Sequence, residues 1–146
     1  MRLTLILLAG LALAACNNAP EAPPADNTAP PAPPPVLAGV DLTQPVRAIG
    51  TEPFWAVDIT PQTLIYSAPD DPGVSAPNPG PTIQGTTAVY ATTSNGTALV
   101  VTLIATECSD GMSDRVYPLT ARVERGSQTL NGCAASVAFL ESQPQP

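Results

Sequence analysis

Between residues 36 and 141 the chain consists of short apolar runs, rich in Val, Ile, Leu and Thr, separated by Pro, Gly, Asn and Asp. In several runs apolar and polar positions alternate, as where Leu119, Ala121 and Val123 are interleaved with polar residues. A period of two predicts strands with one buried face. The pattern therefore predicts an all-β domain, a small antiparallel barrel or sandwich of about seven or eight strands. The predicted strands are residues 46–50, 54–59, 63–67, 88–93, 98–106, 117–125, 128–133 and 136–140.

The links between these runs indicate how the strands connect. Residues 60–62, 94–96 and 125–127 are short links with turn residues, which is typical of antiparallel hairpins. Residues 68–81 contain five prolines and two glycines, so we expect a long surface loop without a regular strand. No window keeps the 3.6-residue period of a helix over three turns, so no helix of that length is expected.

The start of the chain follows a different pattern. Arg2 is followed by an almost unbroken apolar stretch over residues 3–15. This stretch is shorter than the ~20 residues that cross a bilayer as a helix, and it fits the core of a secretory signal. It ends in Leu13-Ala14-Ala15-Cys16, which resembles the lipobox of bacterial lipoproteins. The alternatives are an ordinary cleaved signal with an incidental Cys16, or a short uncleaved anchor.

The lipobox resemblance implies a signal peptide at residues 1–15 and a lipid anchor on Cys16. The thiol would carry a diacylglycerol and the new amino group a further acyl chain, and such chains together hold a protein stably on a membrane. Asn17 is not the aspartate that, in bacterial lipoproteins, favours retention in the inner membrane. We therefore expect the outer membrane, facing the periplasm.

The segment after the predicted anchor has the composition of a tether. Residues 17–35 contain eight prolines and no apolar residue larger than Ala. A segment with so little to bury stays extended, so residues 16–35 are predicted to be the anchor and linker of a β domain at residues 36–141. Residues 142–146 contain two prolines and no apolar side chain, and we expect a disordered tail there.

The composition excludes several classes of function. Five Arg, twelve Asp and Glu residues and no Lys or His give a net charge of −7, which argues against nucleic acid as a partner. Without His or Lys the chain has no Ser-His or Cys-His relay, no His-ligated zinc and no Schiff-base lysine. Glu107, Asp110 and Asp114 lie close together, but their spacing is not that of the EF-hand calcium loop. We expect no cofactor and no metal site.

Two cysteines remain if Cys16 carries lipid, namely Cys108 and Cys133. The periplasm is oxidising, so an isolated pair in an exported domain is predicted to form a disulfide. Free thiols, or a metal or redox role for the pair, are the alternatives. The spacing does not resemble a Cys-x-x-Cys redox motif.

Two segments are more constrained than ordinary strand sequence. One is Gly50-Thr51-Glu52-Pro53-Phe54-Trp55. The other is residues 107–118, which include Cys108 and Asp110-Gly111-Met112-Ser113-Asp114, followed after a hairpin by residues 130–134, which include Gly132-Cys133-Ala134. With the lipobox, these segments resemble a family of uncharacterised bacterial lipoproteins and predicted membrane proteins. Its members carry Gly-x-Glu-Pro-Phe-Trp, Cys-x-Asp-Gly-Met-Ser-Asp and Gly-Cys-Ala motifs. The resemblance spans about residues 46–134, implies an envelope protein and assigns no catalytic residue.

The loops at residues 50–55 and 109–117 are the candidate contact surface, because binding sites are often loops on a rigid scaffold. The candidate partner-binding residues are Glu52, Phe54, Trp55, Asp110, Met112, Asp114, Arg115 and Tyr117. Phe54 and Trp55 are neighbours in a predicted strand, so their side chains should face opposite sides. Trp55 is either packed in the core or rim, or a stacking platform for a sugar or peptide.

These observations predict an envelope lipoprotein whose non-enzymatic β domain binds a periplasmic protein or glycan. One alternative is inhibition of a cationic lysozyme, because the resembling family is found alongside the periplasmic C-type lysozyme inhibitor and an acidic domain suits such a partner. A second is an enzyme that acts on envelope glycans through paired carboxylates among Glu52, Asp58, Glu107 and Asp110. A third is a purely structural or stress-related envelope component.

Overall fold

The structure is a computed structural model, and it describes residues 32–143. The predicted signal peptide, the predicted anchor Cys16, the tether up to residue 31 and the last three residues of the chain lie outside the described residues. Within residues 32–143, no helix has both the length and the apolar character needed to cross a bilayer.

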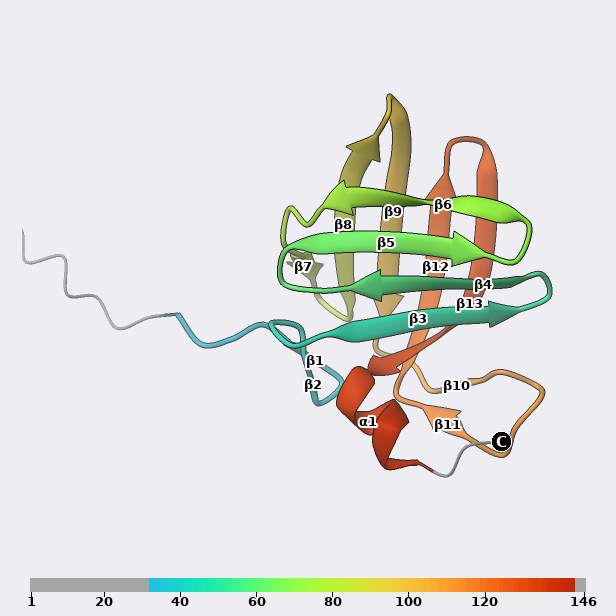
Figure 1. Cartoon of the computed structure of the whole chain (residues 1–146). Coiled ribbons are helices and arrows are strands. Elements are labelled where there is room, and N and C mark those ends of the chain that lie inside the picture. Colours follow the sequence, from blue (N-terminus) through green and yellow to red (C-terminus); the bar gives the residue numbers. More distant parts are fainter. Residues whose placement is uncertain (1–31, 144–146) are drawn as a thin grey trace, which may run out of the picture. The chain divides into compact units, whose positions relative to one another are not determined.

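Nine antiparallel strands form one sheet, which confirms the predicted all-β class (Figure 1). The strands are β3 (Val46–Thr51), β4 (Phe54–Ile59), β5 (Thr63–Ala68), β6 (Asp71–Pro77), β7 (Thr82–Gln84), β8 (Thr87–Ser94), β9 (Thr97–Ile104), β12 (Leu119–Arg125) and β13 (Gln128–Ser136). Their order across the sheet is β6-β5-β4-β3-β13-β12-β9-β8-β7. Most neighbours in this order are also consecutive along the chain, so hairpins build most of the sheet.

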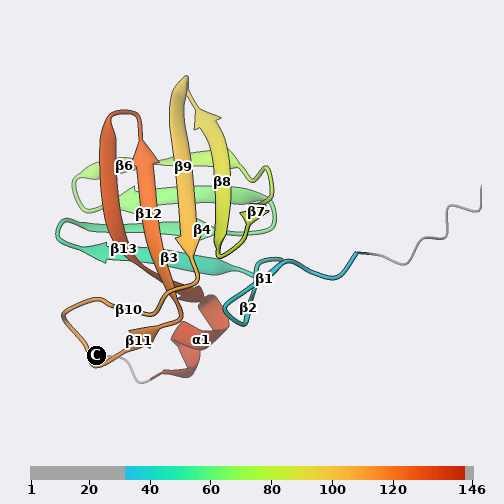
Figure 2. The same cartoon turned by 180° about the vertical axis from the view of Figure 1, so that it is seen from behind.

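The sheet curls into a half-barrel because β13 belongs to both of its halves. Residues 128–134 pair with β12, whereas residues 133–136 pair with β3. Figures 1 and 2 show β3 to β6 running across β8, β9 and β12, with the two groups of strands facing each other. The far ends of the sheet also approach each other, because the hydroxyls of Thr92 and Ser94 in β8 donate to carbonyls of β6 at 3.1 and 2.9 Å.

The interior of the half-barrel is filled by every second residue of the strands, since side chains alternate between the two faces of a sheet. The largest fully buried side chains of this core include Tyr90, Ile59, Leu64, Leu99, Leu103 and Leu119. A small hairpin of β1 (Val36–Leu37) and β2 (Val40–Asp41) adds Leu37 and Val40 to the same core. The domain therefore has one main hydrophobic core.

A second, smaller cluster lies on the outer face of β13. There β10 (Cys108–Ser109) and β11 (Val116–Tyr117) form a two-stranded sheet, and the helix α1 (Val137–Ser142) lies nearby (Figure 1). Tyr117, Cys133 and Ala135 are buried in this cluster, and Phe139 and Leu140 pack against them. The segment that carries the Cys108 motif is therefore attached to the outside of the half-barrel.

The three predicted hairpin turns are confirmed. Residues 60–62, 94–96 and 125–127 connect β4 to β5, β8 to β9 and β12 to β13. In the second of these turns, Asn95 and Gly96 both have positive φ, 50° and 78°, as a two-residue type I′ turn requires.

Two predicted elements were wrong. Residues 68–81, expected to be a loop, contain β6, the last strand of the sheet, which pairs with β5. An edge strand tolerates Pro72 and Pro77 because one of its sides needs no ladder hydrogen bonds. Residues 136–140, expected to be a strand, instead begin α1, where the Ser136 hydroxyl accepts a hydrogen bond from the Phe139 amide at 3.1 Å and caps the helix.

Candidate functional site

Trp55 lies where the two motif segments meet. Its side chain points from β4 into the core and is 4% exposed. A Cβ atom at Gly50, its cross-strand partner on β3, would overlap the indole ring. A Cβ atom at Gly132 on β13 would overlap a β3 carbonyl and crowd the same ring. Both glycines therefore make room for Trp55, and its ring is packed inside the domain rather than presented as a surface platform.

Phe54 faces the opposite side of β4, as the alternation predicted. Its side chain is 55% exposed. The preceding turn contains a cis peptide bond between Glu52 and Pro53, an arrangement found in tight turns with proline at the third position. The first motif thus presents Glu52, Pro53 and Phe54 at the surface, while Trp55 fixes this turn to the core.

Asp110 organises the second motif, and we call residues 109–117 the Asp110 loop. Its Oδ1 accepts hydrogen bonds from the amides of Met112 at 3.0 Å and Ser113 at 2.8 Å. Its Oδ2 accepts bonds from the hydroxyls of Ser113 and Tyr117, both at 2.9 Å. Gly111, with φ 71°, allows the chain to turn back between these donors. The loop therefore folds around a single carboxylate.

The pKa of Asp110 reflects this environment. Partial burial alone raises the pKa, but the amides of Met112 and Ser113 and the hydroxyls of Ser113 and Tyr117 favour the charged form more strongly. The net effect lowers the pKa of Asp110 from 3.8 to about 2. Burial and the hydrogen bond to Asp110 in turn raise the pKa of the Tyr117 hydroxyl. Asp110 is thus a charged group whose oxygens are used by the loop's own donors.

Two further links hold the Asp110 loop on the half-barrel. The predicted Cys108–Cys133 disulfide is present, with the two Cα atoms 5.4 Å apart. The hydroxyl of Thr51, at the end of β3, donates to the backbone carbonyl of Asp110 at 3.1 Å. The β3–β4 turn and the Asp110 loop are therefore neighbours that are tied to each other and to β13.

The candidate partner-binding residues divide into an exposed and a buried group. The exposed residues are Glu52, Phe54, Met112 and Asp114. The buried or half-buried residues are Trp55, Asp110, Arg115 and Tyr117. Tyr117 is only 1% exposed, and the Arg115 guanidinium lies 5.8 Å from the centre of its ring. In this structure Trp55 and Tyr117 support the loops from inside and do not form part of a contact surface.

The four carboxylates considered for glycan hydrolysis are differently placed. Glu52 and Asp110 line one hollow of about 330 Å³ between the β3–β4 turn and the Asp110 loop, whereas Asp58 and Glu107 are not among its lining residues. Asp58 lies on the outer face of β4, where Arg47 donates to both of its oxygens at 2.6 and 2.9 Å. Since Asp110 already accepts four bonds, the hollow offers Glu52 alone where a glycosidase needs two carboxylates.

Across residues 32–143, no group of three or more His, Cys, Asp or Glu side chains is placed to hold a metal ion. Within the Asp110 loop, the lone pairs that a hard cation such as calcium would use are directed at amides and hydroxyls of the loop itself.

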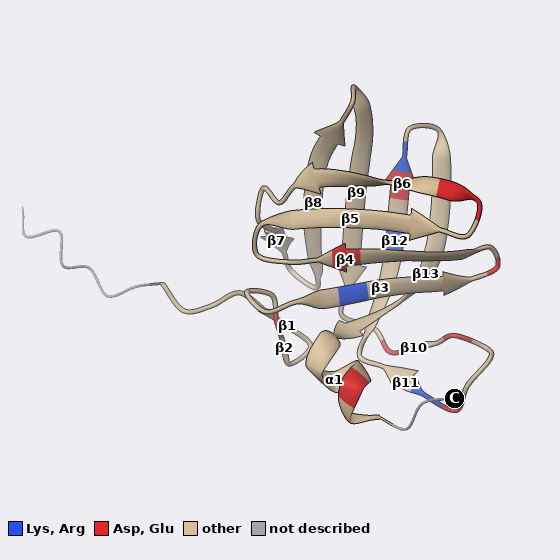
Figure 3. Cartoon of the chain, in the orientation of Figure 1, with Lys and Arg blue, Asp and Glu red and all other residues tan. Residues whose placement is uncertain are grey.

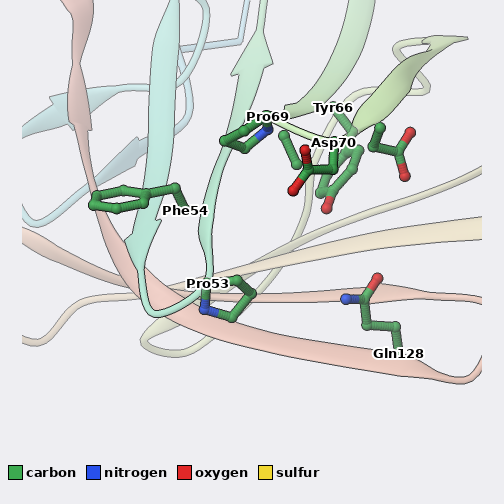
Figure 4. Close-up of a pocket in the computed structure, with 8 residues that line it drawn as sticks. Pro53, Phe54, Tyr66, Pro69, Asp70 and Gln128 are labelled. Atoms are coloured by element: carbon green, nitrogen blue, oxygen red, sulfur yellow. The ribbon is translucent and has the colours of Figure 1, made fainter.

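Two hollows flank Phe54, and both are also lined by Ala68 and Pro69. The first, which we call the acidic hollow, has a volume of about 440 Å³. Its other lining residues include Pro53, Tyr66, Asp70, Asp71 and Gln128 (Figure 4). The second, which we call the apolar hollow, has a volume of about 380 Å³. Its other lining residues include Ile49, Thr51, Ala56 and Ser67 on the outer faces of β3, β4 and β5.

One side of the acidic hollow is built on a fixed charge cluster. The Arg125 guanidinium lies 4.7 Å from the centre of the Tyr66 ring and forms an ion pair with Asp71. The hydrogen bonds from Arg125 and from the Gly73 amide lower the pKa of Asp71. The charge of Asp71 is therefore paired within the domain, although its side chain is only partly buried. Its neighbour Asp70 is exposed, and it forms no ion pair with any residue in the range 32–143.

The lining residues of the acidic hollow carry no clear signal in the linear sequence. They come from the β3–β4 turn, the β5–β6 turn and the start of β13, which the curl of the sheet brings together. The adjacent acids Asp70 and Asp71 are noticeable in the sequence, but they lie in a segment expected to be an irregular loop.

No protein-family model, curated protein or solved structure matches this chain. The family resemblance of the two motif segments accordingly stays a prediction.

Proposed function

We propose that this chain is a lipid-anchored protein of the bacterial envelope whose non-enzymatic β domain binds a periplasmic partner through the β3–β4 turn and the Asp110 loop. The lipobox resemblance at residues 13–16 supports the anchor and the compartment. The disulfide between Cys108 and Cys133 agrees with an oxidising compartment.

The binding role rests on exposed apolar side chains on two ordered loops. Phe54 is 55% exposed, Met112 67% and Val116 56%, although the core holds most other large apolar residues. In both Figures 1 and 2 the β3–β4 turn and the Asp110 loop lie on the same side of the domain. Single exposed apolar side chains are ordinary, but three on two loops joined by the Thr51–Asp110 hydrogen bond support an interaction surface. A protein partner is favoured over a glycan, because Trp55, the side chain best suited to stack on a sugar, is buried.

Site-specific photo-cross-linking in the native host tests this role. A benzophenone side chain would replace Phe54 or Met112 in the full-length protein, and a third version would carry it at the exposed position 62 on the β4–β5 turn. We expect one discrete adduct from positions 54 and 112 and none from position 62. Adducts of equal yield from all three positions, or none from any, would contradict the proposal.

A matched pair of variants separates a specific contact from chance proximity. In the version that cross-links from position 112, Phe54→Ala should reduce the adduct several-fold. Ile83→Ala, which removes an aliphatic side chain that is 40% exposed on β7, should leave the adduct unchanged. Equal effects of the two substitutions would argue that the adduct does not report a contact at the β3–β4 turn.

The anchor is tested separately. Cys16→Ser should move the protein from the membrane fraction to the soluble periplasmic fraction and abolish labelling with palmitate. Sedimentation of this variant with membranes would show that the anchor prediction is wrong.

A further inference from the structure

The surface of the domain carries more negative charge than its own cations neutralise. Residues 32–143 contain four arginines and ten acidic residues (Figure 3). Three of the arginines form ion pairs, with Asp58, Glu124 and Asp71, and the fourth lies against the ring of Tyr117. The positive charge of the domain is thus engaged internally, while acids such as Asp70 face solvent.

The two hollows around Phe54 differ in chemistry. The apolar hollow is walled by side chains of Ile49 and Ala56, with Phe54 at its border. The acidic hollow has the side chains of Asp70, Asp71, Gln128 and Tyr66 as polar groups, and of its two carboxylates Asp71 is already paired with Arg125. In Figure 4 Phe54 lies on one side of the view and Asp70 on the other, with Pro69 above and Pro53 below the space between them. A ligand that crosses Phe54 would therefore meet an apolar surface on one side and a free carboxylate with apolar walls on the other.

We infer that the surface across Phe54 binds an extended segment of a basic protein, in which an apolar side chain lies two residues from a Lys or Arg. This inference rests on the proposed function and specifies the chemistry of its partner. Charge complementarity selects the partner, because the domain has unpaired carboxylates and no unpaired cation to attract an acidic chain. An anionic envelope polymer would be repelled by the same surface.

The spacing in the ligand follows from strand geometry. In an extended chain, residues i and i+2 point to the same side and lie about 7 Å apart, which is close to the width of an aromatic ring. The apolar side chain would enter the apolar hollow, and the aliphatic stem of the Lys or Arg would lie between Pro53 and Pro69. Its charged end would reach the Asp70 carboxylate and the Gln128 amide oxygen, while its stem stays on apolar surface.

Nuclear magnetic resonance titration of the full-length, isotope-labelled protein in detergent tests the inference. Three acetylated and amidated decapeptides would be compared, identical except for a central Leu-Ser-Lys, Leu-Ser-acetyllysine or Ser-Ser-Lys. We expect the first to shift the amides of residues 53–56 and 67–71. Acetylation of the lysine, or loss of the leucine, should each weaken binding by about threefold to tenfold. Equal affinity for the lysine and acetyllysine peptides would overturn the inference.

Charge-matched variants assign the effect to the acidic hollow. Asp70→Asn should abolish the preference for lysine over acetyllysine, whereas Glu141→Gln, which removes one exposed charge on α1, should preserve it. Phe54→Ala should weaken the binding of all three peptides. An equal loss of preference in both charge variants would show diffuse attraction and would also overturn the inference.

The two proposals can fail independently. If position 54 cross-links to a partner in cells but the peptides show no preference for lysine, the proposed function stands and the basic segment is excluded as the ligand. If lysine preference depends on Asp70 but no cross-link forms in cells, the hollow has the inferred chemistry and the proposed contact surface is wrong.

Discussion

Replacement of Asp110 by Asn should destabilise the domain and remove part of its pH dependence. The carboxylate accepts two amide and two hydroxyl hydrogen bonds. An amide side chain keeps only one oxygen and turns an NH2 group toward two of the donors. Hydrogen bonds to a charged acceptor contribute about 1.5 to 3 kcal/mol each when buried, and Asp110 is only half-buried. We therefore expect Asp110→Asn to lower the free energy of unfolding by about 2 kcal/mol in total.

The pH dependence of stability follows from the lowered pKa. The pKa of Asp110 is about 2 in the folded domain against an ordinary value of 3.8. A lowered pKa stabilises the folded state above the unfolded value, and this contribution is lost as pH falls through the folded value. The shift corresponds to at most about 2.5 kcal/mol, and solvent screening at a half-exposed carboxylate reduces it to about 1 to 2 kcal/mol. Between pH 5 and pH 2, the wild type should therefore lose about this much more stability than Asp110→Asn.

Urea unfolding followed by the fluorescence of Trp55, the single tryptophan, provides the assay. Asp114→Asn is the matched control, because it makes the same charge change in the same loop at an exposed carboxylate that accepts none of the four bonds. The control should stay within about 0.5 kcal/mol of wild type at both pH values. If Asp110→Asn is as stable as Asp114→Asn, or loses stability in acid as steeply as wild type, the carboxylate does not organise the loop.

Three further substitutions test other parts of the structure. The double variant Cys108→Ala/Cys133→Ala removes a disulfide that joins residues with a sequence separation of 25, and chain entropy predicts that its free energy of unfolding in urea falls by about 3.5 kcal/mol. Reducing the disulfide of the wild type should lower its free energy of unfolding by a similar amount. Tyr90→Phe removes a buried hydroxyl with no partner in residues 32–143 and should raise the unfolding free energy by about 1 kcal/mol; a loss of that size would reveal a hidden partner. Gly132→Ala should lower the free energy of unfolding by about 2 to 3 kcal/mol and shift the fluorescence emission of Trp55 to longer wavelength. Unchanged emission would show that the indole ring can stay buried without a glycine at position 132.

The strands and hairpins could be predicted because their signals are local. The alternation of apolar and polar residues over 119–123 predicts a strand with one buried face, and the Asn-Gly pair at residues 95 and 96 predicts a tight turn. β6 and α1 could not be predicted in this way. The prolines of β6 are compatible with a strand only at the edge of a sheet, and the sequence does not state which strand is at the edge. The residues of α1 form too short a run for periodicity to distinguish a helix from a strand.

The candidate site was predictable only in part, because burial depends on what packs from elsewhere in the chain. Phe54 and Trp55 could be assigned to opposite faces from their adjacency, but the sequence does not say which face is covered. The acidic hollow combines Pro53 and Asp70 from two turns with Gln128 from the start of β13, and nothing in their local sequence indicates that the curled sheet brings them together. The motif carboxylate Asp110 suggested a contact residue, yet the structure uses its oxygens to hold the Asp110 loop.

β13, which pairs with both β12 and β3, carries the residues that hold the two motif segments next to each other. Gly132 faces the core, where the absence of a side chain admits Trp55, and the next residue, Cys133, faces outward and bonds to Cys108. Two consecutive residues thus hold the two segments: Gly132 accommodates Trp55, which follows the β3–β4 turn, and Cys133 forms the disulfide that holds the Asp110 loop. Because Thr51 also links that turn to the loop, a shift at Gly132 would move both exposed segments together. The turn that carries Phe54 is therefore tied to the core through Trp55 and to the Asp110 loop through Thr51, which limits the conformational freedom that must be lost when a partner binds.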